Sequence, residues 1–551
     1  TGGISAFLSR VETSGGVIFL LGACSGASER LYEHICSRFC TPEDIKNEFE
    51  RYAERCEALC GNFVFSTGNS ARDAMLSFYL PYQALYTRML ARTGLYQSSG
   101  AYGFRDQLQD SLAAMRMKPE LTKVQLYRSA AHQFTDGTAM HWWHFTRGGD
   151  RGVRSRCSDD YLWLPYVCAR YIDYTGDETV LSAHIYYRES PHLADSENER
   201  YEIPQRSELC EDMYSHCIRA IEHALVFGEH GLPFIGSCDW NDGMNAVGDD
   251  GRGESVWLAF FLAMTLADFS VVCDKRGDTD RSARYRDIRE KLLLSVNENA
   301  YGGDRYLRAY FDNGTPLGAA DCAECAIDIL PQAFSAIVSG KTKRTKTALH
   351  TMYDNLFDSD NGIMCLLAPS FDRRAQYPGY IAGYVPGIRE NGGQYTHAAV
   401  WAAWGLFEGG MCDAAFNILC AIDPAERYDS DSHFIDCYLN EPYALSGDVY
   451  YNRDHIGRGG WSHYTGAAAW YYGVYISEVL GFELHGTVFT LNPKICGGIE
   501  HFRTIIKVDG GVWHISVSSG DKTGYISDGK IVNNVFHLDK SEHFIEITVE
   551  K

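Results

Sequence analysis

The sequence predicts a mainly α-helical protein whose main domain is an (α/α)6 barrel, with a small β-sandwich at its C-terminal end. Three observations carry this prediction. Between about residues 61 and 481, amphipathic patterns with helical spacing recur about a dozen times, each ending in a polar or glycine-containing loop. After residue 481 the pattern changes to short alternating strands. A length of 551 residues also exceeds one ordinary core, so smaller domains beside the large one are expected.

The first 60 residues divide into two short segments. Residues 1–24 alternate in polarity and are typical of the last strands of an N-terminal β-sandwich, most of which would lie outside this sequence. Residues 25–60 are charged and amphipathic with helical spacing, which predicts a helical linker. Within it, Thr41 precedes Pro42 as a capping residue precedes a helix start.

The barrel is predicted to occupy residues 61–481. Six helical hairpins arranged in a closed ring are one natural way to enclose a single core, although periodicity alone leaves a helical solenoid open. The clearest helical patterns cover residues 161–174, 207–227, 254–269, 324–338, 396–407 and 465–480. The C-terminal β-sandwich, residues 482–551, has its clearest strands at 486–491, 502–508, 512–517 and 544–549.

The composition excludes some classes of partner. The chain has 72 acidic and 50 basic residues, a net charge of -22, and contains no block of Lys and Arg, so nucleic acid is not an expected partner. The 18 cysteines are scattered without zinc-like pairs, which favours free thiols and a cytoplasmic location. We expect no membrane segment, because no apolar run approaches the length needed to cross a bilayer.

The turn Asp239-Trp-Asn-Asp242 is the most unusual short stretch of the chain. It places two carboxylates, an indole and a carboxamide in consecutive positions between glycines, where a turn can aim side chains into a pocket. A helix cap rich in Asp and Asn is the alternative interpretation, and the tetrapeptide alone does not decide between them.

Two further loops carry charged and aromatic residues. In residues 98–110, Arg105 suits a bidentate contact with hydroxyls or a carboxylate, and Asp106 or Asp110 could accept hydrogen bonds from sugar hydroxyls. The equally good alternative is a buried Arg–Asp pair that fixes a helix start. His141 and His144 have a spacing that suits metal ligation on a helix. The two intervening tryptophans and the lack of a third ligand favour a stacking wall instead, so no metal site is predicted. Residues 158–160 are predicted to cap the helix that begins near residue 161.

Two loops end at helix starts that suit an anion. Residues 383–397 bring Tyr384, Arg389, Glu390 and His397 to the start of a helix, and a second loop ends at Thr465 and Gly466. Hydrolysis of a glycoside usually needs two carboxylates, one as acid and one as base or nucleophile. If the nucleophile is inorganic phosphate, one acid and an anion pocket suffice, and these loops offer that combination.

The chain resembles the inverting disaccharide and oligosaccharide phosphorylases of glycoside hydrolase family 94, the relatives of cellobiose and chitobiose phosphorylases. The resemblance covers nearly the whole chain and rests on YGFRDQLQD (102–110), RCSDDYLWLP (156–165), DWNDGMN (239–245), GIRENGGQYTH (387–397) and YTG (464–466). Among members, the loops MHWWH and QYTHAAVW resemble those of cyclic β-1,2-glucan synthases and cellobionic acid phosphorylases.

The resemblance assigns roles to individual residues. It implies Asp242 as the general acid, Arg105, Asp110 and Trp240 as donor-sugar contacts, Tyr384 and Glu390 as acceptor contacts, and His397, Thr465 and Gly466 as phosphate contacts. It also implies an N-terminal β-sandwich, a helical linker, an (α/α)6 barrel and a C-terminal β-sandwich, in a protein that is usually a homodimer.

The sequence therefore predicts a reversible, inverting phosphorolysis of a β-linked glucose disaccharide or oligosaccharide. Inorganic phosphate would be a substrate, α-D-glucose 1-phosphate a product, and no cofactor would be required. One alternative is an inverting β-glucan hydrolase in which Asp239 or Glu390 activates water. The other is a non-catalytic glucan-binding module of a larger glucan synthase. The linkage and the acceptor are not determined by the sequence.

Overall fold

The computed structural model describes residues 4–13, 16–25, 33, 37–39, 41–90, 100–194, 196–372, 376–430 and 432–550. The chain forms two compact units, Thr1–Gly61 and Asn62–Lys551. In the first unit, strands β1 (Ile4–Thr13) and β2 (Gly16–Ser25) form an antiparallel hairpin, and α2 covers Pro42–Cys60.

The predicted cap of α2 is confirmed. The Thr41 hydroxyl accepts a hydrogen bond from the Asp44 amide at 3.2 Å, and the Asp44 carboxylate accepts one from the Thr41 amide at 3.0 Å. This reciprocal pair satisfies two backbone donors at the helix start. Other parts of the predicted linker, residues 26–32, 34–36 and 40, lie outside the described residues.

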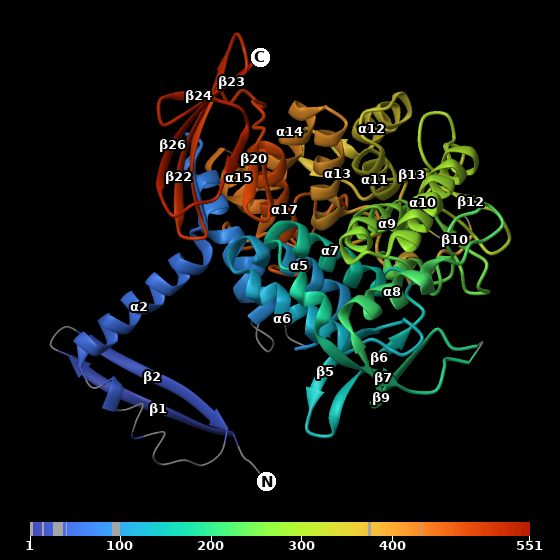
Figure 1. The fold of residues 1–551 in the computed structure, drawn as a ribbon, viewed down its shortest axis with the longest axis horizontal. Coiled ribbons are helices and arrows are strands. Elements are labelled where there is room, and N and C mark those ends of the chain that lie inside the picture. Colours follow the sequence, from blue (N-terminus) through green and yellow to red (C-terminus); the bar gives the residue numbers. More distant parts are fainter. Residues whose placement is uncertain are drawn as a thin grey trace. The chain divides into compact units, whose positions relative to one another are not determined.

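The second unit contains a closed ring of inner helices (Figure 1). Each inner helix contacts the next, and the last contacts the first, which excludes the solenoid alternative and confirms the predicted (α/α)6 barrel. In ring order these helices are α5 (Phe104–Met117), α7 (Trp163–Thr175), α9 (Val256–Arg276), α11 (Ile329–Ser339), α13 (Thr396–Glu408) and α17 (Ala467–Val474).

An outer layer covers this ring. Five outer helices each pack on the inner helix that precedes them: α6 (Pro119–Ala130), α8 (Met213–Ala224), α10 (Thr279–Asn299), α12 (Lys343–Leu356) and α14 (Cys412–Ile422). The sixth outer position is filled from the start of the unit, by α3 (Ser70–Ala74), η1 (Met75–Tyr79), α4 (Leu80–Tyr82) and η2 (Gln83–Leu90). Two short helices follow α14, namely α15 (Pro424–Ser430) and α16 (Ser432–Tyr438).

Aromatic side chains fill the barrel core. Trp163, Trp257 and Trp401, from three different inner helices, are fully buried, and Trp401 stacks on the other two with ring centroids 6.4 and 6.1 Å apart. Large rings bury much apolar area per residue, so a few of them can fill the space between six helices.

The apolar helix α9 corrects one expectation. An 18-residue window of this helix has a mean hydropathy of 2.0, so it is long and apolar enough to span a membrane, contrary to the prediction from the sequence. In the structure 78% of that window is buried. The helix lies between α7 and α11 in the inner ring, which explains why it is apolar on all sides.

Two small sheets interrupt the helical region where the sequence predicted helix or loop. One has the order β4 (Tyr102–Gly103), β5 (Met140–Thr146), β6 (Gly149–Ser155) and β8 (Glu199–Glu202), and the other pairs β7 (His184–Glu189) with β9 (Gln205–Asp212). The predicted helix over 207–227 therefore begins only at Met213. Residues 205–212 form a strand because they pair with β7. Apolar residues three and four positions apart favour a helix but do not exclude a strand, so the sequence pattern alone could not show this.

Short paired segments join the helices. They are β10 (Glu254–Ser255), β11 (Ala309–Tyr310) and β12 (Pro316–Leu317) in one sheet, and the pairs β13 (Ile327–Asp328) with β16 (Leu367–Ala368), β14 (Phe357–Asp358) with β15 (Ile363–Met364), and β17 (Gln394–Tyr395) with β18 (Asp448–Val449).

The C-terminal strands form two sheets. The larger has the order β24 (Lys530–Val532), β23 (Gly524–Ser527), β26 (Glu542–Glu550), β22 (Gly511–Gly520), β21 (His501–Val508) and β3 (Phe63–Ser66), and the smaller the order β19 (Phe482–His485), β20 (Val488–Leu491) and β25 (Val535–His537). Phe489 of the smaller sheet packs edge-on against Trp513 of the larger, 5.4 Å away. The predicted strands at 486–491, 502–508, 512–517 and 544–549 are all present, although β3 comes from the region assigned to the barrel by sequence.

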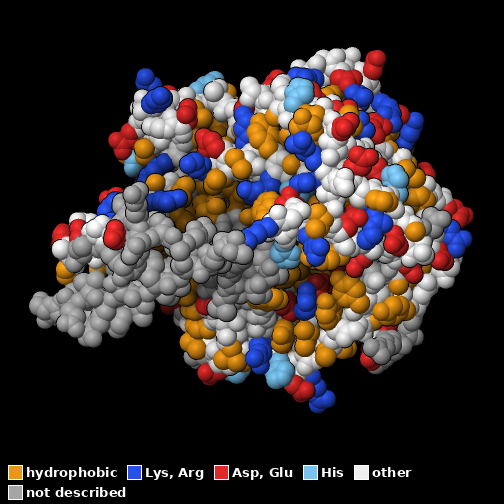
Figure 2. All heavy atoms as spheres, turned by 90° about the horizontal axis from the view of Figure 1, so that it is seen from below, with side chains coloured by type: hydrophobic (Ala, Val, Ile, Leu, Met, Phe, Trp, Pro, Cys, Tyr) orange, Lys and Arg blue, Asp and Glu red, His pale blue; other side chains and the backbone are white. Residues whose placement is uncertain are grey.

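One face of the molecule mixes both charges. On the face in Figure 2, acidic and basic side chains are interspersed, with hydrophobic side chains among them. The face offers no large basic field of the kind that would follow a phosphate backbone, in keeping with the net charge of -22.

Strand β3 gives a test of how the barrel and the larger sheet are joined. Phe63 is fully buried and contacts Phe482 and Tyr472 edge-on, with centroids 5.3 and 6.2 Å apart. We expect Phe63→Ala to destabilise the protein by about 3 to 5 kcal/mol, because it leaves a cavity. Val64→Ala, on the more exposed face of the strand, is the control and should cost far less. Urea unfolding followed by tryptophan fluorescence measures both, and equal shifts in the midpoint would contradict this arrangement.

Candidate active site

A cavity of about 340 Å³ opens at the end of the ring where α5, α13 and α17 begin. Its walls are polar and aromatic. Six of the residues predicted from the sequence line this cavity: Arg105, Trp240, Asp242, Glu390, His397 and Thr465. Its walls also contain Arg88, His141, Trp142, Tyr380, Arg389, Tyr395 and Tyr464.

The turn at 239–242 is fixed by a buried ion pair. Both carboxylate oxygens of Asp239 accept hydrogen bonds from the Arg308 guanidinium at 2.7 Å, and one of them also accepts from the Ser255 hydroxyl at 2.7 Å. Asp239 and Arg308 are both fully buried. Although burial opposes the charge, Arg308 lowers the pKa of Asp239, so it remains a carboxylate. Asp239 therefore braces the turn, and none of its oxygens is available to activate water.

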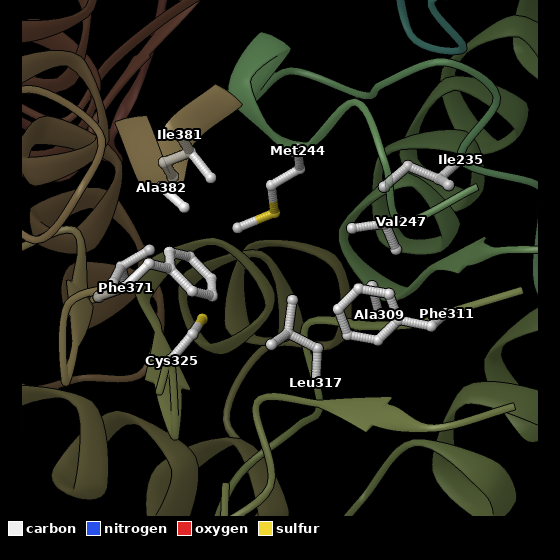
Figure 3. Close-up of a cluster of buried hydrophobic side chains, with 11 residues drawn as sticks. Ile235, Met244, Val247, Ala309, Phe311, Leu317, Cys325, Phe371, Ile381 and Ala382 are labelled. Atoms are coloured by element: carbon white, nitrogen blue, oxygen red, sulfur yellow. The ribbon is translucent and has the colours of Figure 1, made fainter. Parts of the chain in front are cut away.

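A cluster of apolar side chains holds the other side of the turn (Figure 3). Met244 and Ile381 converge there with residues from the loops around them: Ile235, Val247, Ala309, Phe311, Leu317, Cys325, Leu367, Phe371 and Ala382. Gly243 fits because a Cβ at this position would approach Ile381 to 2.8 Å. Gly236, with φ of +64°, makes the preceding bend, where a Cβ would lie 2.1 Å from the Arg156 carbonyl oxygen.

Asp242 is the carboxylate that this turn presents to the cavity. Its side chain is 38% exposed, and one oxygen lies 2.5 Å from Nη2 of Arg105. His141 Nε2 lies 3.8 Å from the other oxygen. Although burial opposes it, the carboxylates of Asp160 and Asp242 raise the pKa of His141 well above its ordinary value. Arg105 therefore holds one oxygen of Asp242 by a hydrogen bond, and His141 lies near the other.

The predicted cap at residues 158–160 has a different role. Asp159 makes no capping hydrogen bond at η3 (Asp160–Leu162); its carboxylate accepts from Arg105 at 2.7 Å and from the Trp163 indole at 3.0 Å. Arg105 also donates to the Asp239 carbonyl oxygen at 3.0 Å. The guanidinium thus bridges α5, the start of α7 and the turn, which combines the two interpretations that the sequence left open for it.

Residues 140–144 form strand β5 and not a helix, so the spacing considered for a metal site does not apply. Trp142 lines the cavity, as a stacking wall would, and Trp143 is buried against the His132 ring at 3.8 Å. His141 Nδ1 is 2.8 Å from an oxygen of Asp160.

The starts of α13 and α17 meet at one corner of the cavity. His397 lies in the first turn of α13, and Gly466 is the N-cap of α17; a Cβ on Gly466 would lie 3.2 Å from the His397 ring. Within the described part of the chain, His397 Nε2 and the Thr465 hydroxyl are buried without a hydrogen-bond partner. Burial, together with the cations Arg88 and Arg105, holds the pKa of His397 well below its ordinary value, so the ring is neutral. Polar atoms left unsatisfied beside two arginines and two helix starts suit an anion.

Backbone strain occurs at the same corner. Thr465 has φ of +70° and Arg389 has φ of +52°, in the left-handed region that β-branched and other non-glycine residues rarely adopt. Such strain costs of order 1 to 3 kcal/mol and is retained where the surroundings impose it.

Two predicted residues lie behind the cavity wall. Asp110 is fully buried and accepts a hydrogen bond from Arg88 Nε at 3.1 Å, so it acts on the cavity through Arg88. Tyr384 packs against the apolar cluster and under the Arg389 guanidinium, 4.9 Å from its ring centre, and Tyr380 lines the cavity in its place. The sequence placed Arg389 in the loop before α13, and the structure places it in the cavity wall. Arg88 was missed because its helix carries none of the motifs, and Tyr464 because only its neighbours in the YTG motif were given a role.

The family model for the catalytic domain of the glycosyl hydrolase 94 superfamily matches residues 56–481. The chain belongs to this family. The resemblance found from the motifs is therefore confirmed, and the matched region contains every predicted site residue of the glycosyl hydrolase 94 domain.

Several characterised proteins are similar to the chain in sequence. It is 37% identical over 484 residues to the cyclic β-(1,2)-glucan synthase NdvB of Rhizobium meliloti, 26% identical over 469 residues to a solabiose phosphorylase of Paenibacillus borealis, and 22% identical over 501 residues to a cellobionic acid phosphorylase of Neurospora crassa. These matches cover 87%, 84% and 88% of this chain but only 17%, 56% and 59% of the respective relatives.

A solved structure supports the fold of the glycosyl hydrolase 94 domain. A bacterial glucoamylase complexed with acarbose aligns with a TM-score of 0.51 at 10% identity, covering 84% of this chain and 63% of that one. At this identity the likeness concerns the fold alone.

Substitution of Asp239 and of Asp242 should change the free energy of unfolding by very different amounts. Asp239→Asn should lower the free energy of unfolding by about 3 kcal/mol, since it leaves the buried Arg308 with one carboxylate partner fewer. Asp242→Asn should change it little, because that carboxylate is partly exposed. Denaturant unfolding of both variants tests this contrast, and a large loss in Asp242→Asn would contradict it.

Proposed function

We propose that this chain catalyses the phosphorolysis of a β-linked glucose oligosaccharide with inversion, in both directions. In this reaction an oxygen of inorganic phosphate forms a bond to the anomeric carbon while the bond from that carbon to the leaving oxygen breaks. The leaving oxygen takes a proton, so the products are α-D-glucose 1-phosphate and a shortened acceptor. The strongest support is that one cavity combines the two groups this reaction needs. The turn at 239–242 presents one available carboxylate, that of Asp242, and another corner holds the unsatisfied polar atoms of His397 and Thr465 beside two helix starts.

In this proposal Asp242 protonates the leaving oxygen. Arg105 holds it, and phosphate arriving in the cavity would compete for the same guanidinium. His397, the Thr465 hydroxyl and the backbone at Gly466 would hold the phosphate, with Arg88 as an additional cation held by Asp110. This neutral His397 can donate one hydrogen bond to an anion from Nε2.

The sugar contacts follow from the cavity walls. Trp240 meets the rings of Tyr395, His397 and Trp401 at 5.1 to 5.3 Å and presents an aromatic surface next to Asp242 for the donor glucose. Glu390, paired with Arg389 at 3.3 Å, and Tyr380 would contact the acceptor, whereas Tyr384 would act on this side of the cavity through Arg389. The names of the relatives, which include phosphorylases and a β-(1,2)-glucan synthase, make a β-1,2-linked glucose oligosaccharide the first substrate to test.

One observation favours an inverting hydrolase as the second candidate. Glu390 lines the same cavity as Asp242, and its Oε2, which lies 3.3 Å from Arg389 Nε, accepts no hydrogen bond within the described part of the chain. Burial raises the pKa of Glu390 and the Asp242 charge raises it further, which disfavours the carboxylate form that a general base needs.

Sugar release with and without phosphate separates these functions. We expect release of α-D-glucose 1-phosphate from a β-1,2-glucan oligosaccharide only when phosphate is present, and a loss of about 10² to 10⁴-fold in Asp242→Asn, the usual size of general acid catalysis. Glu390→Gln serves as the matched control, since it should weaken acceptor binding more than turnover. Phosphate-independent release of glucose, abolished in Glu390→Gln, would identify a hydrolase instead, and oligosaccharide binding without turnover would identify a binding module.

Thr465 combines strain with a predicted phosphate contact, so its two contributions can be separated. Thr465→Gly relieves the left-handed backbone and should stabilise the protein by about 1 kcal/mol or more, while removal of the hydroxyl should raise the KM for phosphate about tenfold. Thr465→Ser retains the hydroxyl and is the control for phosphate binding. Thermal unfolding and initial rates at varied phosphate measure the two effects; unchanged KM in Thr465→Gly would remove this residue from the phosphate site.

A further inference from the structure

A row of paired residues leads from the active-site cavity to the protein surface. Trp142 of β5 pairs with Gly103 of β4 on one side and with Val153 of β6 on the other, and Val153 pairs in turn with Tyr201 of β8. Gly103 and Trp142 line the cavity, whereas Tyr201, on the edge strand of this sheet, is 54% exposed. Figure 1 shows β5 and β6 extending away from the inner helices. The sheet therefore continues the cavity wall outward.

The rings of this row lie on one face of the sheet, here called the cavity-side face. Directly paired residues project from the same face, and the ring centroids of Trp142 and Tyr201 are 5.5 Å apart with their planes tilted by 38°. Val153, between them in the row, is buried. His144, two residues after Trp142, is also in the cavity wall and meets the Trp142 ring edge-on at 5.5 Å.

A cation accompanies these rings. Arg151 pairs with His144 across β5 and β6, and its guanidinium carbon lies 5.7 Å from the centre of the Tyr201 ring. An exposed aromatic surface with polar groups at its margin is typical of a ligand-binding surface. A sugar suits this composition, because the C–H faces of a pyranose pack on aromatic rings while its hydroxyls form hydrogen bonds with polar side chains.

The opposite face of the same sheet has a different environment. There Trp143 is buried, and the Phe145 ring contacts the rings of Tyr102 and His132, with centroids 4.8 and 6.2 Å apart. Phe145 is 54% exposed, as Tyr201 is, but it lies outside the cavity wall. The two exposed rings therefore differ in the face on which they lie and not in their exposure.

We propose that the cavity-side face binds the glucose units of a β-linked glucan chain that lie beyond the acceptor unit, with Tyr201 stacking on one of them. The inference rests on the proposed function, because it takes Asp242 as the point of cleavage. Once the terminal glucose is bound at Trp240, the rest of the chain must leave the cavity.

The geometry gives this chain a path. His141 Nε2 lies 3.8 Å from Asp242, and Trp142 is the next residue of β5. A chain that passes Asp242 along this wall meets Trp142 first and Tyr201 next. A disaccharide is too short to reach Tyr201, whereas a longer oligosaccharide extends onto the cavity-side face.

The dependence of phosphorolysis on chain length tests this inference. We expect the wild type to have a higher kcat/KM for a β-1,2-linked glucose pentasaccharide than for the disaccharide. Tyr201→Ala should lower kcat/KM for the pentasaccharide about three- to tenfold, the usual size of one aromatic contact, and leave the value for the disaccharide unchanged. Tyr201→Phe keeps the ring and should retain the wild-type ratio.

Phe145→Ala is the matched control, since it removes an equally exposed ring from the opposite face of the sheet. It should leave the ratio of the two kcat/KM values unchanged, and thermal unfolding of both alanine variants detects general damage to the sheet. Equal losses for both substrates in Tyr201→Ala, the same change of ratio in Phe145→Ala, or a wild type without preference for the pentasaccharide would overturn the inference.

Calorimetric titration with the pentasaccharide in the absence of phosphate separates this inference from the proposed function. Weaker binding by Tyr201→Ala than by Phe145→Ala, in a chain that phosphorolyses neither substrate, would support the cavity-side face and contradict the proposed function. Phosphate-dependent turnover with wild-type pentasaccharide binding in Tyr201→Ala would have the opposite meaning, because only the inference would then be wrong.

Discussion

The ion pair between Asp239 and Arg308 is the interaction on which the site depends. Both side chains are fully buried and joined by two hydrogen bonds of 2.7 Å, and Arg308 Nε lies 3.3 Å from Asp328, the N-cap of α11. One guanidinium therefore fixes the turn at 239–242 relative to a strand and to the start of an inner helix. A buried pair of this kind adds little net stability compared with apolar packing, but it is intolerant of losing one partner. Its contribution here is to set one orientation for Asp242.

The cavity then separates two kinds of chemistry. On the turn, Asp242 is held between Arg105 and His141, so a carboxylate stands where a leaving group could be protonated. Another corner of the cavity offers hydrogen-bond donors, namely the neutral His397 ring and the Thr465 hydroxyl at the starts of α13 and α17. Neither of these side-chain groups has a hydrogen-bond partner within the described part of the protein. The left-handed backbone at Thr465 shows that the surroundings, and not local preference, determine the geometry of this corner.

The sequence predicted five of the six inner helices, α7, α9, α11, α13 and α17, because apolar residues recur over the whole length of each; α5 was not among its clearest patterns. It did not predict the strands at 140–155 and 184–212. Strands β5 and β6 pair as a local hairpin, but β8 pairs with β6 and β9 with β7 across longer stretches of chain, and local spacing does not report such pairing. Short motifs located the site residues in cavity walls, but not the distinction between Asp110, which lies behind Arg88, and the residues that reach the cavity. The two acids of the turn are the same residue type, and their surroundings assign them different tasks. Asp239 is fully buried against Arg308, whereas Asp242 is partly exposed to the cavity beside Arg105.

The central claim is that the corner at His397, Thr465 and Gly466 holds the phosphate that acts as nucleophile. A crystal structure of the protein with phosphate, at a concentration that saturates turnover, tests it most directly. Our account predicts one phosphate in hydrogen-bond contact with His397 Nε2 and the Thr465 hydroxyl, on the same side of the cavity as the start of α17 and facing Asp242 across the space for a sugar. A corner without an anion under those conditions would contradict it.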